Sequence, residues 1–182
     1  EHSYHWTVIG YETDIKNWTK EDLEKYFKTY YAPNNCVVVV SGNVKVAEVK
    51  RLAEKYMAPI PASNPPKPVN LVEPPQTGER RVYTQKEVPS PHLMIGYHTP
   101  EAKSKDFYAL SILSSVLSSG NSSRLHSELV DKKQLASMVG TDFSESFDPN
   151  LFMIYALAAK GVNESDIENA VYSEIEKIKK DG

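Results

Sequence analysis

A dense cluster of prolines near the middle of the chain constrains the possible folds more than any other feature of the sequence. Seven of the 12 prolines fall between Pro59 and Pro75. Proline fixes φ and lacks a backbone N–H donor, so this stretch can form neither a helix nor a central strand. We therefore expect an extended linker at residues 63–78, which separates one structural piece at residues 1–62 from a second domain at residues 79–182.

Composition and charge narrow the class of protein. Of the 182 residues, 40% are hydrophobic and 25% charged, which is typical of a globular protein. The net charge of −3 offers no basic surface for nucleic acid. No apolar run approaches the ~18–20 residues that a membrane span needs. The single cysteine, Cys36, excludes an internal disulfide framework and leaves the localisation unknown.

The piece before the linker has too few elements for an independent sheet. After an irregular segment that ends near Trp18, Thr19 and Asp22 stand in capping-box positions at the start of a helix. The β-branched run Cys36–Val40 predicts a strand buried on both faces, and a second amphipathic helix is expected over residues 46–56. Because a sheet needs further strands, we expect this chain to be an excised piece of a longer polypeptide, the parent, with those strands before residue 1.

The piece after the linker carries enough elements for a two-layer domain. Strands are expected at 81–87, 92–98, 138–144 and 151–159, and helices at 106–118, 122–133 and from Asn163 to the end. This order predicts an α+β fold in which an antiparallel sheet has helices on one face. Ile112 and Val116 widen the apolar face of the helix at 106–118, so we expect that helix to be mostly buried.

The sequence lacks the histidine spacing of a zinc hydrolase. Neither HExxH nor HxxEH occurs, and the nearest segment, His98–Ala102, has alanine in place of the second histidine. His2 and His5 could bind a metal if a carboxylate converged on them, but an aromatic-rich loop that packs onto a neighbouring domain explains them better. His92 and His98 would lie ~20 Å apart along one strand, too far to share an ion.

No nucleophile motif is complete either. Gly120–Arg124 departs from the nucleophile elbow at its last residue and follows a helix, so a helix cap explains it better. Cys36 at the start of a valine run is expected to be a core thiol. We therefore predict no catalytic, cofactor-binding or metal-binding residue in this chain, and no activity of the chain alone.

Six blocks of the sequence carry a recognisable pattern in collinear order. They are His2–Gly10, Asp14–Leu23, Tyr30–Asn35, Val37–Asn43, Leu117–Leu125 and Glu128–Ala136. Together they resemble the insulinase/pitrilysin (M16) metallopeptidase family across essentially the whole chain. One departure is Ser3, where the family usually has proline.

The resemblance implies an M16 fold similar to that of mitochondrial processing peptidase, with α+β domains arranged as a clamshell around a peptide chamber. In that family an HxxEH helix and a distant glutamate hold zinc, and the glutamate within the motif is the general base for the metal-bound water. Both zinc elements precede the segment that resembles His2–Gly10. Residues 1–62 would then be the C-terminal part of the metal-bearing domain, and residues 79–182 the following non-catalytic domain.

The resemblance also implies partners and a missing substrate contact. Zinc would belong to the parent and not to this fragment, and the parent would bind a peptide or an unfolded protein through M16 domains of the same chain or of another subunit. A distal domain of the family holds substrate with an arginine and a tyrosine seven residues apart. Val130 and Ser137 stand at the matching positions here, so this domain cannot supply that pair.

Two functions follow from the resemblance. In the first, the chain is a non-catalytic region of a zinc endopeptidase that helps to enclose the peptide chamber and packs on the catalytic domain. In the alternative, the parent is a zinc-less relative, similar to the core subunits of a respiratory complex, and the chain is a scaffold or binding module. An HxxEH motif upstream distinguishes the two.

Overall fold

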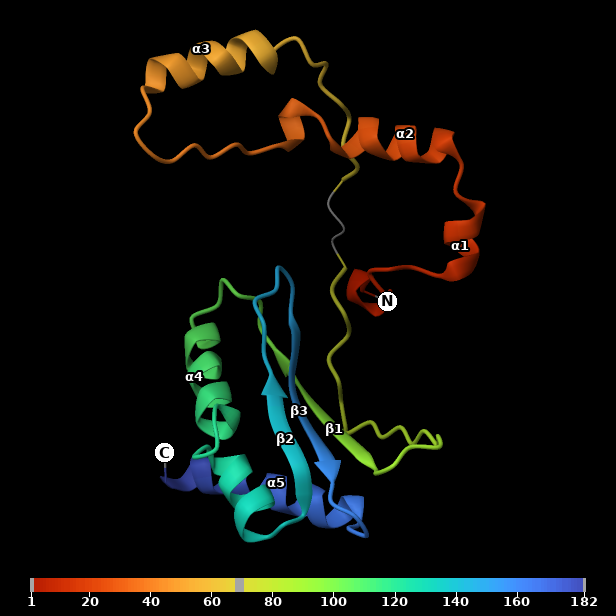
Figure 1. Ribbon diagram of the computed structural model, residues 1–182, viewed down its shortest axis with the longest axis vertical. Coiled ribbons are helices and arrows are strands. Elements are labelled where there is room, and N and C mark those ends of the chain that lie inside the picture. The colour runs from red at the N-terminus through yellow and green to blue at the C-terminus, as the bar shows by residue number, and fades with distance from the viewer. Residues whose placement is uncertain (1, 68–70, 182) are drawn as a thin grey trace. The chain divides into compact units, whose positions relative to one another are not determined.

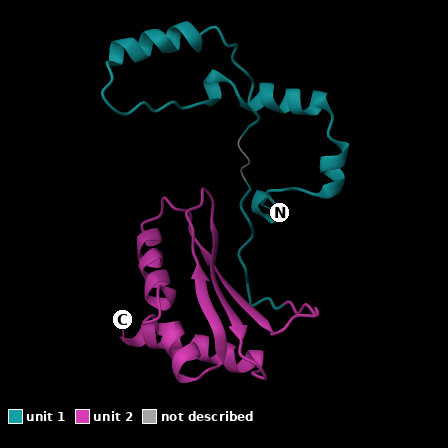
Figure 2. Ribbon diagram, in the orientation of Figure 1, with its two compact units in different colours: residues 1–81 teal, residues 82–182 magenta. Residues whose placement is uncertain are grey.

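The computed structural model describes residues 2–67 and 71–181, so part of the predicted linker, residues 68–70, lies outside the described residues. The chain divides into two units, residues 1–81 and residues 82–182 (Figure 2). Each unit is described by itself below, and Figure 1 labels their helices and strands.

Unit 1 consists of short helices joined by extended segments. The structure adds a short helix, α1 (Glu12–Asn17), to the segment predicted to be irregular. Helix α2 (Lys20–Tyr30) starts with the predicted capping box, in which the Asp22 backbone N–H donates to Thr19 Oγ1 and the Thr19 backbone N–H donates to the Asp22 carboxylate. Helix α3 (Val46–Tyr56) occupies the predicted range.

The strand predicted at Cys36–Val40 is wrong for the described residues. This segment is extended, but it has no strand partner there, and Val37 and Val39 are 90% and 84% exposed. A β-branched run favours the extended backbone, yet a strand also needs the hydrogen bonds of a neighbouring strand.

Unit 2 is built on a three-stranded antiparallel sheet. Its strands are β1 (His92–Thr99), β2 (Ala136–Asp142) and β3 (Asn150–Ala158), in the spatial order β1-β3-β2. The register places Ile95 opposite Ile154 and Thr141 on the other side of the same residue. The strand predicted at 81–87 is wrong, because that segment is extended and unpaired within the described part of the chain.

The helices of unit 2 lie on one face of this sheet (Figure 1). They are α4 (Asp106–Ser118), the π-helix η3 (His126–Lys132) and α5 (Glu164–Asp181). Alternate residues of β3, from Phe152 to Ala158, are buried beneath them, as the period of a strand with one covered face requires. Leu117, Leu129 and Val171 complete the core. The predicted α+β class is confirmed.

One predicted detail of the helices differs. Ile112 and Val116 of α4 are exposed, so the expectation that this helix is mostly buried is wrong. At the end of α5, Glu176 pairs with Lys179, three residues on, at 2.5 Å. The predicted αL position is present, because Gly120 has φ = +78° at the end of α4.

Candidate functional site

The histidines near the N-terminus are engaged with their neighbours. His2 Nδ1 accepts a hydrogen bond from the Tyr4 backbone N–H at 3.2 Å, and the two rings pack edge to face. The His5 ring packs in the same way on Trp6. The His2 backbone N–H donates to Glu73 Oε1 at 3.4 Å, and this hydrogen bond is the main reason why the pKa of the Glu73 carboxyl is lowered.

Two histidines stand near the ends of β1. His92 lies opposite Leu157 and His98 opposite Leu151. The two histidines therefore stand six positions apart along β1. Within residues 2–67 and 71–181, no group of three or more His, Cys, Asp or Glu side chains is placed to hold a metal ion.

A serine, a histidine and an aspartate follow one another near η3, but they do not form a catalytic relay. His126 Nδ1 lies 3.5 Å from Asp131 Oδ2. Ser123 is almost fully buried, and its hydroxyl has no hydrogen-bond partner within the described part of the chain. A serine nucleophile is activated by a hydrogen bond from its hydroxyl to a base. The Ser123 hydroxyl makes no such hydrogen bond among the described residues.

The strongest electrostatic feature of unit 2 is a buried carboxylate. Glu174 of α5 is 4% exposed and lies 3.5 Å from Arg124 Nε, and it also pairs with Lys177. The hydrogen bond to Glu174 raises the pKa of the Lys177 ammonium group, and a hydrogen bond from Lys133 lowers the pKa of the nearby Glu128 carboxyl. The sequence analysis missed the Arg124–Glu174 pair, because 50 positions separate the partners and no local spacing links them.

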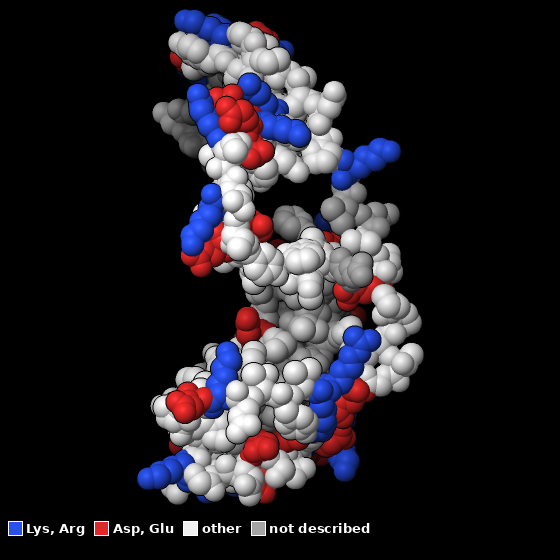
Figure 3. All heavy atoms as spheres, turned by 90° about the vertical axis from the view of Figure 1, so that its right-hand side faces the viewer, with Lys and Arg blue, Asp and Glu red and all other residues white. Residues whose placement is uncertain are grey.

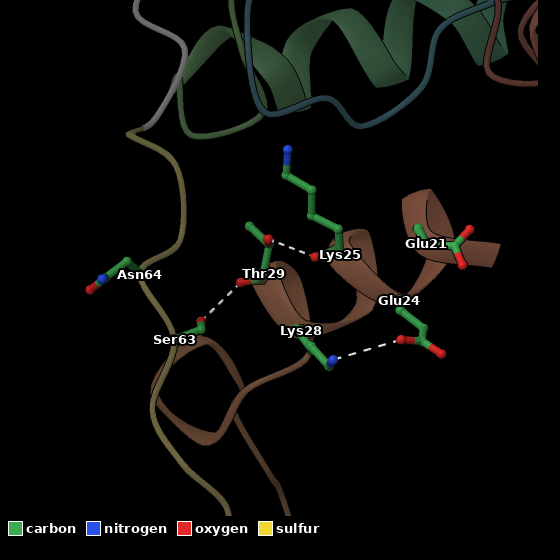
Figure 4. A pocket seen from close by; sticks show the side chains of 7 residues that line it. All are labelled: Glu21, Glu24, Lys25, Lys28, Thr29, Ser63 and Asn64. Carbon is green, nitrogen blue, oxygen red and sulfur yellow. Dashed lines mark hydrogen bonds and ion pairs between the residues drawn. The ribbon is translucent and has the colours of Figure 1, made fainter. Parts of the chain in front are cut away.

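One surface hollow lies beside α2 in unit 1. Figure 4 shows its lining, in which Lys28 pairs with Glu24 and the Ser63 hydroxyl donates to the Thr29 carbonyl at 2.9 Å. The lining side chains mostly face solvent and pair with one another. The hollow therefore holds no set of converging groups that points to a ligand.

Unit 1 exposes most of its large apolar side chains. Ala32 is the one hydrophobic residue that it buries within the described range. Along α2 the exposed side chains are Leu23, Tyr26, Phe27 and Tyr30; beyond it they include Val37, Val38, Val39, Val40, Val46, Leu52 and Tyr56. Contiguous apolar surface of this extent is unusual on a folded protein.

Unit 2 contains an apolar groove between α4 and α5, which we call the α4–α5 groove. Its volume is about 580 Å³, and its lining includes Leu113 and Leu117 of α4, Phe152 of the sheet and Ile175 of α5. Thr99, at the end of β1, lines the groove at 5% exposure. Its hydroxyl has no hydrogen-bond partner among the residues that the structure describes.

Charges of both signs lie on the face of the molecule that Figure 3 shows. On the face presented in Figure 3, Lys and Arg side chains are interspersed with Asp and Glu side chains. Among the described residues, no helix has the length and apolar character needed to cross a membrane.

Val130 and Ser137, which the sequence resemblance matched to a substrate-holding pair, lie in η3 and β2. Val130 of η3 packs against the core of unit 2. Ser137 of β2 is exposed, and its hydroxyl donates to the Leu157 carbonyl at 3.3 Å. The structure thus places one of these side chains in the core and the other on the sheet.

Residues 17–182 match the family model described as the peptidase M16 inactive domain. The chain is 37% identical over 183 residues to the zinc protease PqqE of Helicobacter pylori, covering 98% of this chain and 41% of that protein. It is 28% identical over 176 residues to the beta subunit of the mitochondrial-processing peptidase of Blastocladiella emersonii, covering 92% of this chain and 37% of that protein. The chain therefore spans about two fifths of the curated relatives it matches.

Solved structures agree with this similarity. A crystal structure of a protease from Helicobacter pylori superposes with a TM-score of 0.83 at 36% identity, covering 98% of this chain and 44% of that one. The peptidase M16 inactive domain from Pseudomonas fluorescens superposes with a TM-score of 0.72 at 20% identity, covering 98% of this chain and 43% of that one, and shows likeness of fold alone.

Proposed function

Because this chain belongs to the M16 peptidase family and matches its inactive domain, we propose that it is the non-catalytic region of a zinc-dependent endopeptidase. In this role residues 1–62 complete the metal-bearing domain and residues 79–182 form the following domain. Residues 63–78 are the linker between the two domains. The region encloses part of the peptide chamber and packs on the catalytic domain. Zinc and its HxxEH ligands belong to the upstream part of the parent.

The observation that carries this proposal is the exposed apolar surface of unit 1. Val37–Val40 is extended, with its side chains in solvent and without a strand partner in the described residues. Burying one valine side chain contributes about 1.5–3 kcal/mol. A run of four such residues therefore has a large driving force to enter a sheet as an internal strand, and the proposed partner is the sheet of the metal-bearing domain.

The names of the relatives support the same reading. One is a zinc protease and another is a subunit of a processing peptidase. Zinc in a hydrolase lowers the pKa of its bound water and needs a carboxylate to accept the proton. On this proposal the present chain contributes neither group and acts by shaping the space around them.

The test is reconstitution of the chain with the segment that precedes it in its gene. The two parts should co-purify, hold one zinc ion in the upstream part, and cleave a quenched fluorescent peptide only together. The substitution Val38→Asp should lower the amount of upstream segment that co-purifies with the chain at least about tenfold, because it places a charge in a buried strand. Gln85→Asp, at an exposed polar position outside this run, should leave it unchanged. Zinc bound to the chain alone, or cleavage by the chain alone, would refute the proposal.

The alternative function is a scaffold or binding module in a zinc-less relative. The same surface of unit 1 would serve it, so association alone does not separate the two. An upstream segment without HxxEH, together with a stable complex that holds no zinc and cleaves no peptide, would establish the alternative.

A further inference from the structure

Helix α4 contacts β2 through serine hydroxyls on one side, while Leu117 on another side reaches the core of unit 2. The hydroxyls of Ser114 and Ser118 lie 2.7 and 2.5 Å from Thr141 Oγ1 of β2, and the Thr141 backbone N–H donates to Ser118 Oγ at 3.1 Å. These short polar side chains bring the helix close to the strand. The contact leaves much of the apolar surface of α4 to face elsewhere.

That apolar surface includes an exposed stripe. Tyr108, Ile112 and Val116 follow one another at intervals of four residues, which places them in one row along the helix. Tyr108 is 72% exposed and Ile112 is 65% exposed. A surface helix normally turns its large apolar side chains toward a packed core and its polar side chains toward solvent. The stripe is therefore an apolar surface that no described segment of this chain covers.

The stripe is continuous with the α4–α5 groove. Ala109 and Leu113 lie next to the stripe on the helix and also line the groove. We call the stripe and the groove together the α4 face. Thr99 lies at the groove with a buried hydroxyl that has no hydrogen-bond partner in the described residues, an arrangement that is unfavourable in free energy. A group that hydrogen-bonds to Thr99 would remove this cost.

The shape of the α4 face identifies the occupant. The face runs along a helix of 13 residues, or about 20 Å at 1.5 Å per residue, so a small molecule in the groove would leave the stripe uncovered. Rows of side chains spaced four apart interdigitate with the rows of another helix. The fitting partner is an amphipathic helix with aliphatic side chains on one face and one hydrogen-bonding group directed at Thr99.

We infer that the α4 face seats an amphipathic helix from the part of the parent polypeptide that lies outside these 182 residues. The inference rests on the proposed function in that it requires a longer M16 polypeptide. More than half of the Helicobacter pylori relative lies outside the region that this chain matches, so a longer polypeptide of that kind has ample chain to supply the helix.

The test measures the accessibility of the α4 face in the complete polypeptide encoded by the gene. In a Cys36→Ser background, a single thiol is introduced by Ile112→Cys, by Val116→Cys as a second variant, and by Ser144→Cys as an exposed control. The rate of maleimide labelling is measured in the complete polypeptide and in the 182-residue chain. A benzophenone maleimide at the same positions then identifies the covering segment by mass spectrometry.

The expected result is that labelling at residues 112 and 116 slows about tenfold or more in the complete polypeptide, while residue 144 changes little. The cross-link should join α4 to a helical segment outside residues 1–182 of the same molecule. Equal labelling rates would overturn the inference, and so would a gene that encodes no further residues. Protection that increases with protein concentration, with cross-links between copies, would assign the face to a second copy. None of these readouts requires zinc, so failure here is separate from failure of the proposed function.

Discussion

At the scale of single residues, Gly120 shows how backbone conformation alone limits a position. Its φ of +78° lies in the left-handed region, and a Cβ built there would meet no heavy atom within 4 Å. Gly120→Val should therefore lower the free energy of unfolding by about 1 kcal/mol or more through backbone strain and not through a clash. Urea unfolding of the 182-residue chain measures this change.

The matched control for that substitution is Gly78→Val. Gly78 also has open space around the position of its Cβ, but its φ is outside the left-handed region. Its substitution should leave the unfolding midpoint nearly unchanged. Equal effects at the two glycines would contradict the assignment of Gly120 as an αL cap.

Glu174 differs from Gly120, because its role depends on a partner that is distant in the sequence. Its carboxylate is buried, and Arg124 and Lys177 approach it from η3's N-terminal side and from its own helix. Burial of an unpaired carboxylate is strongly unfavourable, so these cations are what permit a glutamate in the core. The network joins α5 to the segment that follows α4.

At the scale of elements, the capping box of α2 predicts a specific response to acid. Hydrogen bonds from Thr19 lower the pKa of the Asp22 carboxyl below its ordinary value of 3.8. The stabilisation of α2 is therefore present above the unfolded-state pKa and is lost as pH falls through the lower, folded-state pKa. Cα chemical shifts of residues 20–23 should move toward coil values in that window.

The control for the acid response is α3, whose N-cap residue, Lys45, makes no side-chain hydrogen bond. Its N-terminal shifts should change less over the same window. In Asp22→Asn the first turn of α2 should lose its dependence on pH, because the titrating group is gone. An unchanged titration of α2 in that variant would show that another group controls it.

At the scale of the whole molecule, the two units differ in how their apolar residues are placed. Unit 2 has a core that extends from Leu117 to Val171, whereas unit 1 buries Ala32 and exposes most of its large apolar residues across the described range. A unit without a core opens locally at little cost in free energy. Hydrogen exchange in the 182-residue chain should therefore be fast at residues 37–40 and slow in β3.

The same experiment, repeated on the reconstituted complex, tests the strand that we propose for Val37–Val40. Its amides should become protected there, while those of β3 change little. Slow exchange at residues 37–40 in the chain alone would contradict the exposed conformation seen in the structure.

The sequence alone determined the features whose causes are local. The capping box at Thr19, the bounds of α3, the strand near residues 151–159 and the helix cap at Gly120 each depend on a few neighbouring residues, and all are found in the structure. The resemblance to the M16 family was also readable, because it rests on short blocks in a fixed order, and the family match confirms it.

Only the tertiary structure decided where extended segments and long-range pairs go. The run Cys36–Val40 and residues 81–87 have the composition of strands, but a strand exists only where another strand supplies its hydrogen bonds. The pairing of Arg124 with Glu174 depends on which surfaces meet in the fold, and so does the burial of the Thr99 hydroxyl without a partner in the described residues. No local sequence pattern encodes which surfaces meet. Helix α4 is the plainest case, because its apolar pattern predicts burial of Ile112 and Val116, whereas the fold of this chain leaves both side chains exposed.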